Sequence, residues 1–400
     1  MSARTRVARP PLWPAYLATY TFMVGGWAAA IAVPLHVVSL GGTLAEAGLI
    51  AAIRFGLQAF LQLPFGALTD AWGTRRVLLL ATGGNALINL IPLLAVASGS
   101  TVPYYLWAVL AGITASLFLP ATSAYVATSA PAESRGSAFG WLTFFTHTGV
   151  ASGPAIGGLV WDLGGPVPTF VVATLLGLTA LIGPLFVPRS IRGSVRLSRL
   201  PGMVAEVGRQ RAIVGSWIAA LAIGLPWGAV AGLFPLFGTS IGLAAGTVGL
   251  IMASQSIANG VSRIPLGRFI DRRAIPPVAM AGGAAGYGLM MAVLGVQTSV
   301  PVIVGVLVIG VVMLAFTLML VQVTISEVAR PELRATGLGG YGTALSAGLG
   351  GGPIIAGAVA DAGGFGWAFA VIGGIGVVVA ITAATVLARA RRRPEVVVFD

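Results

Sequence analysis

The chain has 400 residues, of which 57% are apolar and only 8% are charged. A soluble domain carries roughly 25% charged residues, so this composition excludes an ordinary water-soluble protein. The net charge of +12 arises from 23 basic residues, all of them arginine, which lie in alternate loops and so do not indicate nucleic-acid binding. The sequence contains no cysteine, which excludes disulfide and thiol chemistry.

Long apolar segments recur along the chain, and segments of about 20 residues can cross a hydrocarbon layer about 30 Å thick. Because backbone polar groups in lipid must be paired within the segment, we expect helices. We predict an all-α polytopic membrane protein with twelve transmembrane helices. The predicted spans are residues 14–38, 45–68, 76–97, 103–126, 137–160, 167–188, 212–238, 245–268, 276–296, 300–324, 335–360 and 365–388.

Arginine marks one end of these predicted helices. The opposite loops, around Gly41, Gly99, Gly164, Gly242, Thr298 and Gly363, contain none. Basic residues favour the cytoplasmic side, so we predict a multi-pass protein of the cell (inner or plasma) membrane with both termini cytoplasmic. Residues 1–188 and 212–400 are predicted to form two six-helix bundles. Residues 189–211 between them are predicted to form a cytoplasmic linker with a short interfacial helix.

A short polar turn reveals an internal repeat. Gly66-Ala-Leu-Thr-Asp70-Ala-Trp-Gly73-Thr-Arg75-Arg76 has a shorter counterpart in Gly267-Arg-Phe-Ile-Asp271-Arg272-Arg273. Matching positions include Pro34 and Pro235 at an offset of 201 residues, and Gly153 and Gly352 at an offset of 199 residues. Two halves of the same polarity imply a pseudo-twofold axis along the membrane normal and a central cavity between two pseudo-symmetric bundles.

The first turn resembles the loop signature between spans two and three of the major facilitator superfamily. Its Gly66, Asp70, Gly73 and Arg75 stand at signature positions, whereas Ala71 and Thr74 stand where a basic residue is usual. The resemblance covers nearly the whole chain and implies a transporter of twelve spans.

A second pattern is similar to the fifth span of that family's drug and metabolite exporters. It reads Gly140-x8-Gly149-x3-Gly153-Pro154-x2-Gly157-Gly158. The resemblance implies a drug or metabolite:proton antiporter. The alternative is tight helix packing with no bearing on transport direction, because small residues let helices approach closely. An arginine that such exporters often carry in span four is missing, since Trp107 and Ala108 occupy that region.

Polar residues recur at helical spacing inside two equivalent spans. Arg54 and Gln58 lie one turn apart near the middle of the second span, and Gln255 and Asn259 lie at equivalent positions of the eighth. A charge at this depth normally faces a cavity or a partner, so we expect these four residues to bind the solute. The alternatives are a structural role for Arg54 and, for the neighbouring Arg263, snorkelling to the membrane surface.

Aromatic residues could complete such a site. We expect Tyr20, Trp27 and Trp227 to line it, with Phe144 and Trp217 as further candidates. The alternative for each is packing or an interfacial belt.

His147 is the candidate for proton coupling, because histidine changes charge near neutral pH and this residue lies near mid-depth. A structural histidine is the alternative, and His36 is expected at the membrane interface. No Asp or Glu lies at mid-membrane in the sequence. This argues against a cationic solute and favours an anionic or zwitterionic one.

Charges at the cytoplasmic ends are predicted to form a conformational latch. Asp70 and Arg135, with Asp271 and Arg334 in the other half, would join the inner ends in an outward-facing state. We assign Gly66, Gly73, Arg75, Gly153 and Pro154 to gating as well. The alternative is that these are solvated loop charges of little consequence.

The sequence holds no phosphate-binding loop, metal cluster or paired catalytic groups, so we expect no enzyme, cofactor or metal site. We predict a secondary transporter of a small amphipathic solute by alternating access, with proton-coupled efflux as the leading direction. A carrier or exchanger for an organic anion, with Arg54 as counter-charge, is the alternative, and a non-transporting receptor is a remote one. We expect a monomer in the lipid bilayer, with solute, direction and coupling ion left open.

Overall fold

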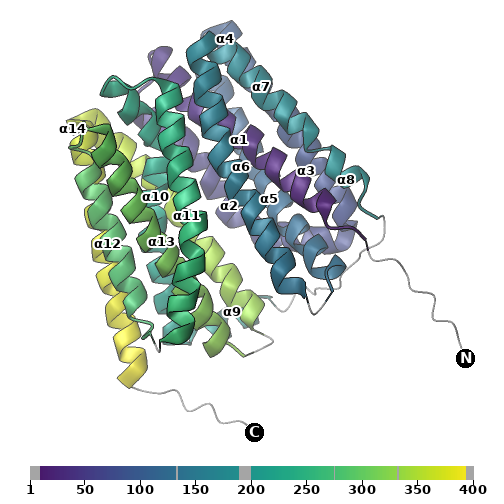
Figure 1. The fold of residues 1–400 in the computed structure, drawn as a ribbon, viewed down its shortest axis with the longest axis vertical. Helices are drawn as coiled ribbons and strands as arrows, with labels where there is room; N and C mark the ends of the chain where they lie inside the picture. The colour runs from purple at the N-terminus through teal and green to yellow at the C-terminus, as the bar shows by residue number, and fades with distance from the viewer. Residues whose placement is uncertain (1–9, 132–133, 189–199, 274, 331–332, 393–400) are drawn as a thin grey trace, which may run out of the picture.

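The computed structural model describes residues 10–131, 134–188, 200–273, 275–330 and 333–392, and all regular secondary structure in these residues is helical (Figure 1). In chain order the helices are α1 (Trp13–Ser39), α2 (Leu44–Trp72), α3 (Thr74–Ile88), α4 (Ile91–Ser98), α5 (Val102–Ser129), α6 (Arg135–Gly164), α7 (Pro166–Thr179), α8 (Ile182–Leu185), α9 (Leu200–Gly208), α10 (Arg211–Ser240), α11 (Ala245–Arg272), α12 (Ala279–Leu294), α13 (Val300–Val328) and α14 (Arg334–Arg392).

The described part of the chain begins and ends at the same end of the molecule, where α6 and α14 begin and α11 ends (Figure 1). We call this the basic end, because Arg135, Arg272 and Arg334 are exposed there. The other end is called the opposite end. The helices of the first and second halves of the chain gather on different sides of the molecule. They converge at the opposite end and diverge toward the basic end (Figure 1).

Eight helical segments among the described residues are long and apolar enough to cross a membrane. The chain is therefore an all-α protein with several membrane-spanning segments, as predicted. Two predicted spans are each split, into α3 and α4 and into α7 and α8. Pro92 and Pro184 lie within α4 and α8, and proline removes a backbone donor and clashes with the preceding turn. Two other predicted spans are joined in α14, where the backbone at Gly364 is not helical (φ 81°, ψ 174°).

The repeat seen in the sequence is present in the backbone. Gly41 and Gly242, which correspond at the offset of 201, both have a φ of 87°. Gly165 and Gly364, which correspond at the offset of 199, have φ values of 74° and 81°. Only glycine adopts such angles readily, so equivalent turns require it in both halves.

At the opposite end, each half of the chain caps a helix of the other half. The carboxylate of Asp361 in α14 accepts hydrogen bonds from the backbone N–H groups of Leu44 and Ala45 at 2.8 and 2.9 Å. The carboxylate of Asp162 in α6 accepts them from the first two residues of α11 at 3.0 and 2.7 Å. First-turn N–H groups lack partners within their helix and carry partial positive charge, so a carboxylate there is stabilising.

The two caps differ in what the capped helix supplies for itself. Helix α2 has its own cap, since the Thr43 side chain accepts a hydrogen bond from the N–H of Glu46 at 3.0 Å. Helix α11 follows Ala244, whose side chain cannot cap it. The bonds to Asp162 are also partly buried, whereas those to Asp361 are exposed. The start of α11 therefore depends more on the other half than the start of α2 does.

Glycine brings the same helix pairs into backbone contact. Gly48 of α2 lies against the carbonyl group of Pro353 in α14, and Gly249 of α11 lies against that of Pro154 in α6. A side chain at either glycine would overlap the facing carbonyl oxygen. We call these contacts, together with the two aspartate caps, the interhalf interface. Pro154, which the sequence assigns to gating, thus belongs to this interface.

The exporter-like glycine pattern in α6 serves packing on a second face as well. A methyl group added at Gly149, Gly153 or Gly157 would come within 2.6 Å of α1 atoms. These glycines let α6 lie directly on α1, as small residues do in membrane helices. Gly140 is different, since a methyl group there would meet nothing within 4 Å. The packing alternative therefore accounts for these three positions.

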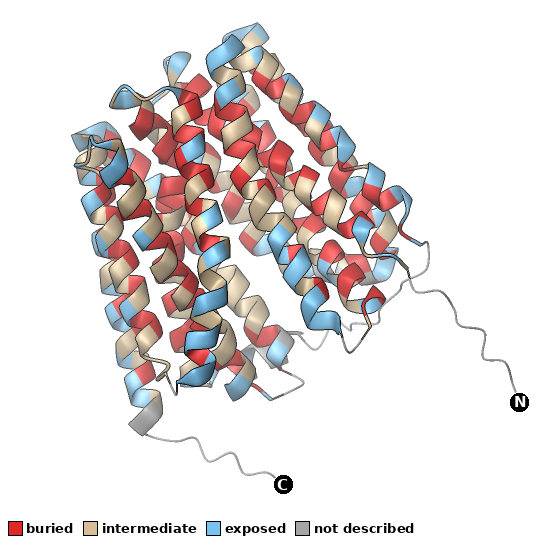
Figure 2. Ribbon diagram, viewed as in Figure 1, coloured by how far each residue is buried: buried red, intermediate tan, exposed pale blue. Residues whose placement is uncertain are grey.

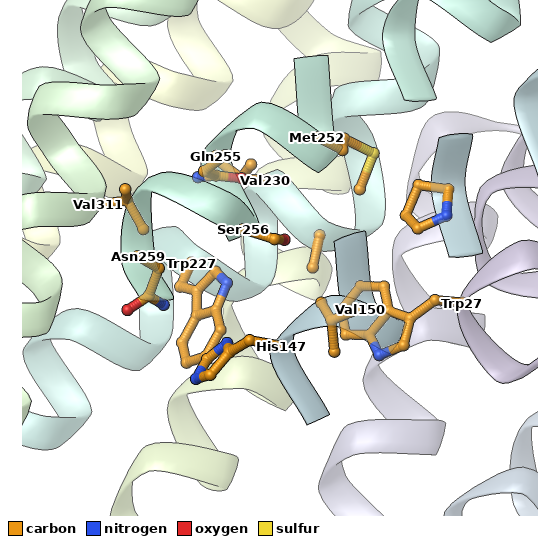
Figure 3. A pocket seen from close by; sticks show the side chains of 12 residues that line it. Trp27, His147, Val150, Trp227, Val230, Met252, Gln255, Ser256, Asn259 and Val311 are labelled. Carbon is orange, nitrogen blue, oxygen red and sulfur yellow. The ribbon is translucent and has the colours of Figure 1, made fainter. Parts of the chain in front are cut away.

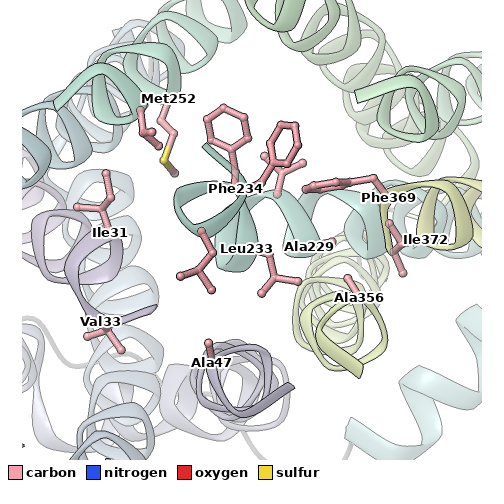
Figure 4. Close-up of a cluster of buried hydrophobic side chains, with 14 of the residues drawn as sticks. Ile31, Val33, Ala47, Ala229, Leu233, Phe234, Met252, Ala356, Phe369 and Ile372 are labelled. Carbon is pink, nitrogen blue, oxygen red and sulfur yellow. The ribbon is translucent and has the colours of Figure 1, made fainter. Parts of the chain in front are cut away.

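Buried apolar side chains continue across the interhalf interface. Ile31 and Ala47, from α1 and α2, belong to one cluster with Leu233 and Met252, from α10 and α11 (Figure 4). The opposite end is thus closed by apolar packing beneath the two polar caps.

We predict that Asp162→Ala opens the opposite end more than Asp361→Ala does. Loss of two hydrogen bonds to a carboxylate should cost about 1–3 kcal/mol of closure, which shifts the open population about tenfold or more. The sequence lacks cysteine, so spin labels can be placed on cysteines at the exposed Ser98 and Thr298 and their separation measured by pulsed electron resonance.

Glu46→Ala is the matched control for this measurement. Glu46 is also a carboxylate at the start of α2, but it accepts a hydrogen bond from Tyr105 within the same half. Its loss should leave the label separation unchanged. Equal separations in wild type and Asp162→Ala would refute a closing role for the caps.

Candidate functional site

A pocket of ≈ 450 Å³ lies between the two halves of the chain. Helices α1 and α6 line it from the first half, and α10, α11 and α13 line it from the second. Five residues predicted from the sequence surround it, namely Trp27, His147, Trp227, Gln255 and Asn259 (Figure 3). We call it the central pocket.

The polar wall of the central pocket comes from one face of α11. Gln255 and Asn259 lie one turn apart and are 7% and 3% exposed. The Asn259 Oδ1 accepts a hydrogen bond from Arg263 Nε at 3.2 Å. The Gln255 Nε2 has no hydrogen-bond partner among the described residues. A buried donor without a partner costs about 1–3 kcal/mol, so this amide is available to a bound solute.

Arg54 lies in a second pocket of ≈ 360 Å³, which adjoins the first because both are lined by Trp27 and Ala231. Its guanidinium carbon is 5.8 Å from the ring centroid of Trp27, 5.5 Å from that of Phe55 and 5.4 Å from that of Trp107. A desolvated cation–π contact is worth up to about 2 kcal/mol. Three rings from α1, α2 and α5 thus stabilise the cation without neutralising it.

The position of Arg54 is set by close helix packing. Gly112 of α5 lies against the backbone of α2, and a methyl group there would come within 2.7 Å of the Arg54 carbonyl oxygen. Arg54 is ten residues from the start of α2, hence about 15 Å from the opposite end at 1.5 Å per residue. The predicted depth near mid-membrane agrees with this position. Among the described residues, no carboxylate forms an ion pair with it.

A third cavity, of ≈ 1010 Å³, separates α6 from α11 on the basic-end side. It shares His147 and Ser256 with the central pocket, so the two spaces are adjacent. Arg263 and Phe144 also line it. We call this cavity the α6–α11 cleft. The central pocket is therefore closed toward the opposite end by the interhalf interface, and the cleft adjoins it on the basic-end side.

Other predicted residues lie elsewhere. The Tyr20 hydroxyl pairs with Ser152 at 3.5 Å, between α1 and α6. The Trp217 indole N–H donates to the Gly337 carbonyl at 2.9 Å, which is a packing contact between α10 and α14. Gln58 is half-buried on α2, one turn from Arg54 toward the basic end, and is not among the residues lining these three cavities.

His36 lies in the last turn of α1 and is buried within the protein. It is only 6% exposed, and its Nδ1 pairs with the Tyr104 hydroxyl inside a cluster with Trp161 and Phe170. The sequence places His36 near a helix end but does not reveal that α5 and α7 cover it.

Three of the four predicted latch side chains are described, and no ion pair is found among these three. Arg135 and Asp271 are exposed, and Arg334 Nε donates to the Ala329 carbonyl at 3.3 Å. The ion pair found among the described residues joins Arg330 to Glu206 of α9 at 3.5 Å instead. Gly73 ends α2 and begins α3 with a φ of 86°, and Arg75 follows it in α3. Gly66 lies in α2, and the Asp70 side chain lies outside the described part of the chain.

Sequence reasoning missed Phe55, Trp107 and Ser256. Phe55 follows Arg54 directly, and Trp107 stands where exporters often carry an arginine. Both residues are aromatic, so neither belongs to a pattern of polar residues. Ser256 follows Gln255, and it is a small uncharged residue that no pattern in the sequence singles out. Their roles come from which helices meet, which the pattern of one helix does not specify.

The arrangement of two chain halves around a pocket that is closed at one end can be compared with known proteins. The profile of the Major Facilitator Superfamily matches residues 15–339 and also residues 216–399. The chain belongs to the Major Facilitator Superfamily. Members of this superfamily are membrane-embedded transporters of small-molecule solutes and not enzymes.

This chain shares little sequence identity with its individual relatives. It is 26% identical over 280 residues to "Multidrug resistance protein MdtG" of Enterobacter lignolyticus, in an alignment covering 66% of this chain and 65% of that protein. The fold is similar to that of a bacterial homologue of the human lysosomal transporter Spinster in an inward-facing, unoccupied conformation. The TM-score is 0.74 and the identity 15%, over 95% of this chain and 96% of that chain.

A second similar structure is the nucleoside transporter NupG, with a TM-score of 0.71 and 15% identity over 94% of this chain and 98% of that chain. At these identities both structures support the fold alone.

We predict that Gln255→Met separates stability from solute binding. Methionine fills the same space without a buried unpaired donor, which removes a cost of about 1–3 kcal/mol from the folded state. The solute-free transporter should therefore unfold at a higher temperature. The rise in unfolding temperature caused by a saturating solute should be lost, because that rise reports affinity. Thermal unfolding of the purified protein measures both.

Tyr287→Phe is the control for this variant. The Tyr287 hydroxyl of α12 is likewise buried without a partner among the described residues, but it lies outside the central pocket. Its removal should stabilise the transporter and preserve the solute effect. A full solute effect in Gln255→Met would exclude Gln255 from the site.

Proposed function

We propose that the protein is a twelve-span exporter of small amphipathic solutes that works by alternating access and is driven by protons. The observation that carries this proposal is the central pocket, closed at the opposite end and adjoined by the α6–α11 cleft on the basic-end side. Arginine at the basic end supports a cytoplasmic orientation of that end. The structure would then correspond to an inward-facing state ready to accept solute from the cell interior.

The twelve spans would form two six-helix bundles, at residues 1–188 and 212–400, joined by the linker at 189–211. On this proposal α3 with α4 and α7 with α8 are single interrupted spans, and α14 supplies two. Helices α6 and α11 have 30 and 28 residues, enough to cross a membrane. We propose that they count as spans although their composition is less apolar, because both line the central pocket.

Export rather than uptake is supported by two features. A relative is named as a multidrug resistance protein, and the central pocket combines two tryptophans with a small number of polar groups. Apolar and aromatic walls with a few placed polar groups are typical of sites for drug-sized ligands.

We assign proton coupling to His147. It stands between the central pocket and the cleft, so its charge would be felt by a solute in either space. The other ionisable side chains that line the three cavities are Arg54 and Arg263, which stay protonated at physiological pH. A histidine between a solute site and an entry path can exchange a proton as the solute moves.

The inner gate would use the predicted latch. Asp70 with Arg135, and Asp271 with Arg334, would meet when the basic ends close and separate when they open. The exposed position of Arg135 and Asp271 is compatible with an open basic end. The polar turn around Gly73 and Arg75 would act with them, and we propose that the transporter acts as a monomer.

We predict that His147→Gln abolishes the effect of a pH gradient on transport. The test is flux in proteoliposomes with an imposed pH gradient, over a panel of drugs and organic anions. Wild-type flux should rise with the gradient, and the His147→Gln flux should not respond to it. His36→Gln is the matched control, because His36 is buried against Tyr104 and lies outside the cavities, so its variant should stay coupled. Unchanged coupling in His147→Gln would place the proton elsewhere.

The second candidate function is carriage or exchange of an organic anion. It is favoured by Arg54, whose charge is surrounded by three aromatic rings and lacks a described carboxylate partner. We predict that Arg54→Met abolishes anion flux, at least about tenfold, while the protein still folds because methionine packs well against aromatic rings. Arg54→Lys should retain part of the flux, since it keeps the charge but not the planar stacking. Near-normal anion flux in Arg54→Met, measured in the same proteoliposomes, would exclude the counter-charge role.

A further inference from the structure

The α6–α11 cleft is lined by apolar side chains that no described part of the chain covers. On α11, Ile257, Val261 and Ile264 follow one another at helical spacing and are 57%, 64% and 64% exposed. Exposed segments recur along this helix toward the basic end (Figure 2). On α6, Phe144 faces the same cavity and is 53% exposed. Apolar surface of this kind marks a binding groove or contact with lipid.

The α6 wall continues as an aromatic cluster. Phe144 packs edge-to-face on Trp141, with ring centroids 5.6 Å apart, and Trp141 is itself 53% exposed. Trp141 is six residues from the start of α6, hence about 9 Å from the basic end. Trp141 therefore lies beside the cleft on its basic-end side, at the depth of the adjoining leaflet if the basic end lies at a membrane surface.

One charged side chain lines the cleft, and it is a cation. Arg263 donates one hydrogen bond to Asn259, and no described carboxylate forms an ion pair with it. A guanidinium has five donors in a planar fork that matches a carboxylate, sulfate or phosphate group. A half-buried cation with unused donors favours an anionic partner over a neutral or cationic one.

The order of groups along the cleft matches an amphiphile in a membrane. Arg263 lies nine residues from the end of α11, about 14 Å from the basic end, whereas Ser256 and His147 lie deeper and border the central pocket. From Ile264 to Ser256 the cleft runs about 12 Å along α11. A head group at Arg263 would thus leave its chain pointing toward the bilayer centre, as it does in the leaflet.

We propose that the α6–α11 cleft binds a single-chain, singly anionic amphiphile taken from the adjoining leaflet, with its head group on Arg263 and its chain between Val261 and Phe144. This inference rests on the proposed export function for its role, since the deep end of the cleft borders the central pocket. The solute class is thereby narrowed to anionic amphiphiles that reach the transporter through the membrane.

Tryptophan quenching in nanodiscs of zwitterionic lipid tests this inference without any transport step. The probe is a dodecyl sulfate brominated near its head group, because bromine quenches indole emission only at close range. The saturable part of the quenching should disappear in Trp141→Phe. Arg263→Gln should weaken sulfate binding about tenfold, the effect of one hydrogen-bonded charge pair, and should not change binding of the matching alcohol.

Two glycine variants separate the cleft from a general effect on the fold. A side chain at Gly260, which lines the cleft, would meet nothing within 4 Å, and the same holds for Gly282 on α12. Gly260→Leu should fill the cleft and abolish saturable quenching, whereas Gly282→Leu should bind as wild type. At both positions a Cβ atom has open space around it.

Three results would overturn the proposal. The first is equal affinity of wild type for the sulfate, the alcohol and the quaternary ammonium analogue. The second is sulfate binding unaffected by Gly260→Leu. The third is complete loss of quenching when the nanodisc contains anionic two-chain phospholipid, which would make the cleft a lipid site. A failure of pH-driven flux with intact sulfate binding would instead contradict the export proposal alone.

Discussion

Reciprocal capping of helix ends is the interaction on which the arrangement of the two halves depends. Each half leaves the first-turn N–H groups of one helix without a partner, and a carboxylate of the other half completes that helix. Because unpaired N–H groups near a membrane are costly, separation of the halves at this end exposes two incomplete helices at once. Asp162 and Asp361 thus give the closed opposite end a specific geometry, and glycine permits the backbone contact beneath it.

Closure at one end determines where a solute can reach the molecule. Helices α6 and α11 touch near Asp162 and are separated by the cleft nearer the basic end. The same two helices therefore serve as a hinge-like contact at one end and as the walls of an entrance at the other. Rocking about such a contact is how a superfamily member of this fold alternates access to its central site.

The ionisable side chains that line the three cavities are arginine and histidine. Arg54 is stabilised by aromatic faces and Arg263 by an amide, so neither positive charge is cancelled by a described carboxylate. On the proposed mechanism, an anionic solute would bring the missing negative charge and favour a protonated His147, while its departure would favour proton release. Solute and proton would then be linked by electrostatics in a low-dielectric space, without a mid-membrane acid.

The sequence by itself determined the helical membrane class, the repeat, the glycine turns and five of the residues around the central pocket. These follow from the length of apolar segments, from fixed offsets and from the spacing of polar residues such as Gln255 and Asn259, all of which are properties of single helices. Only the tertiary structure decided that Trp107 encloses Arg54, that His36 is buried, and that Asp361 caps a helix 317 residues away. Periodicity states which face of a helix a residue occupies, whereas the partner of that face depends on how separate helices pack.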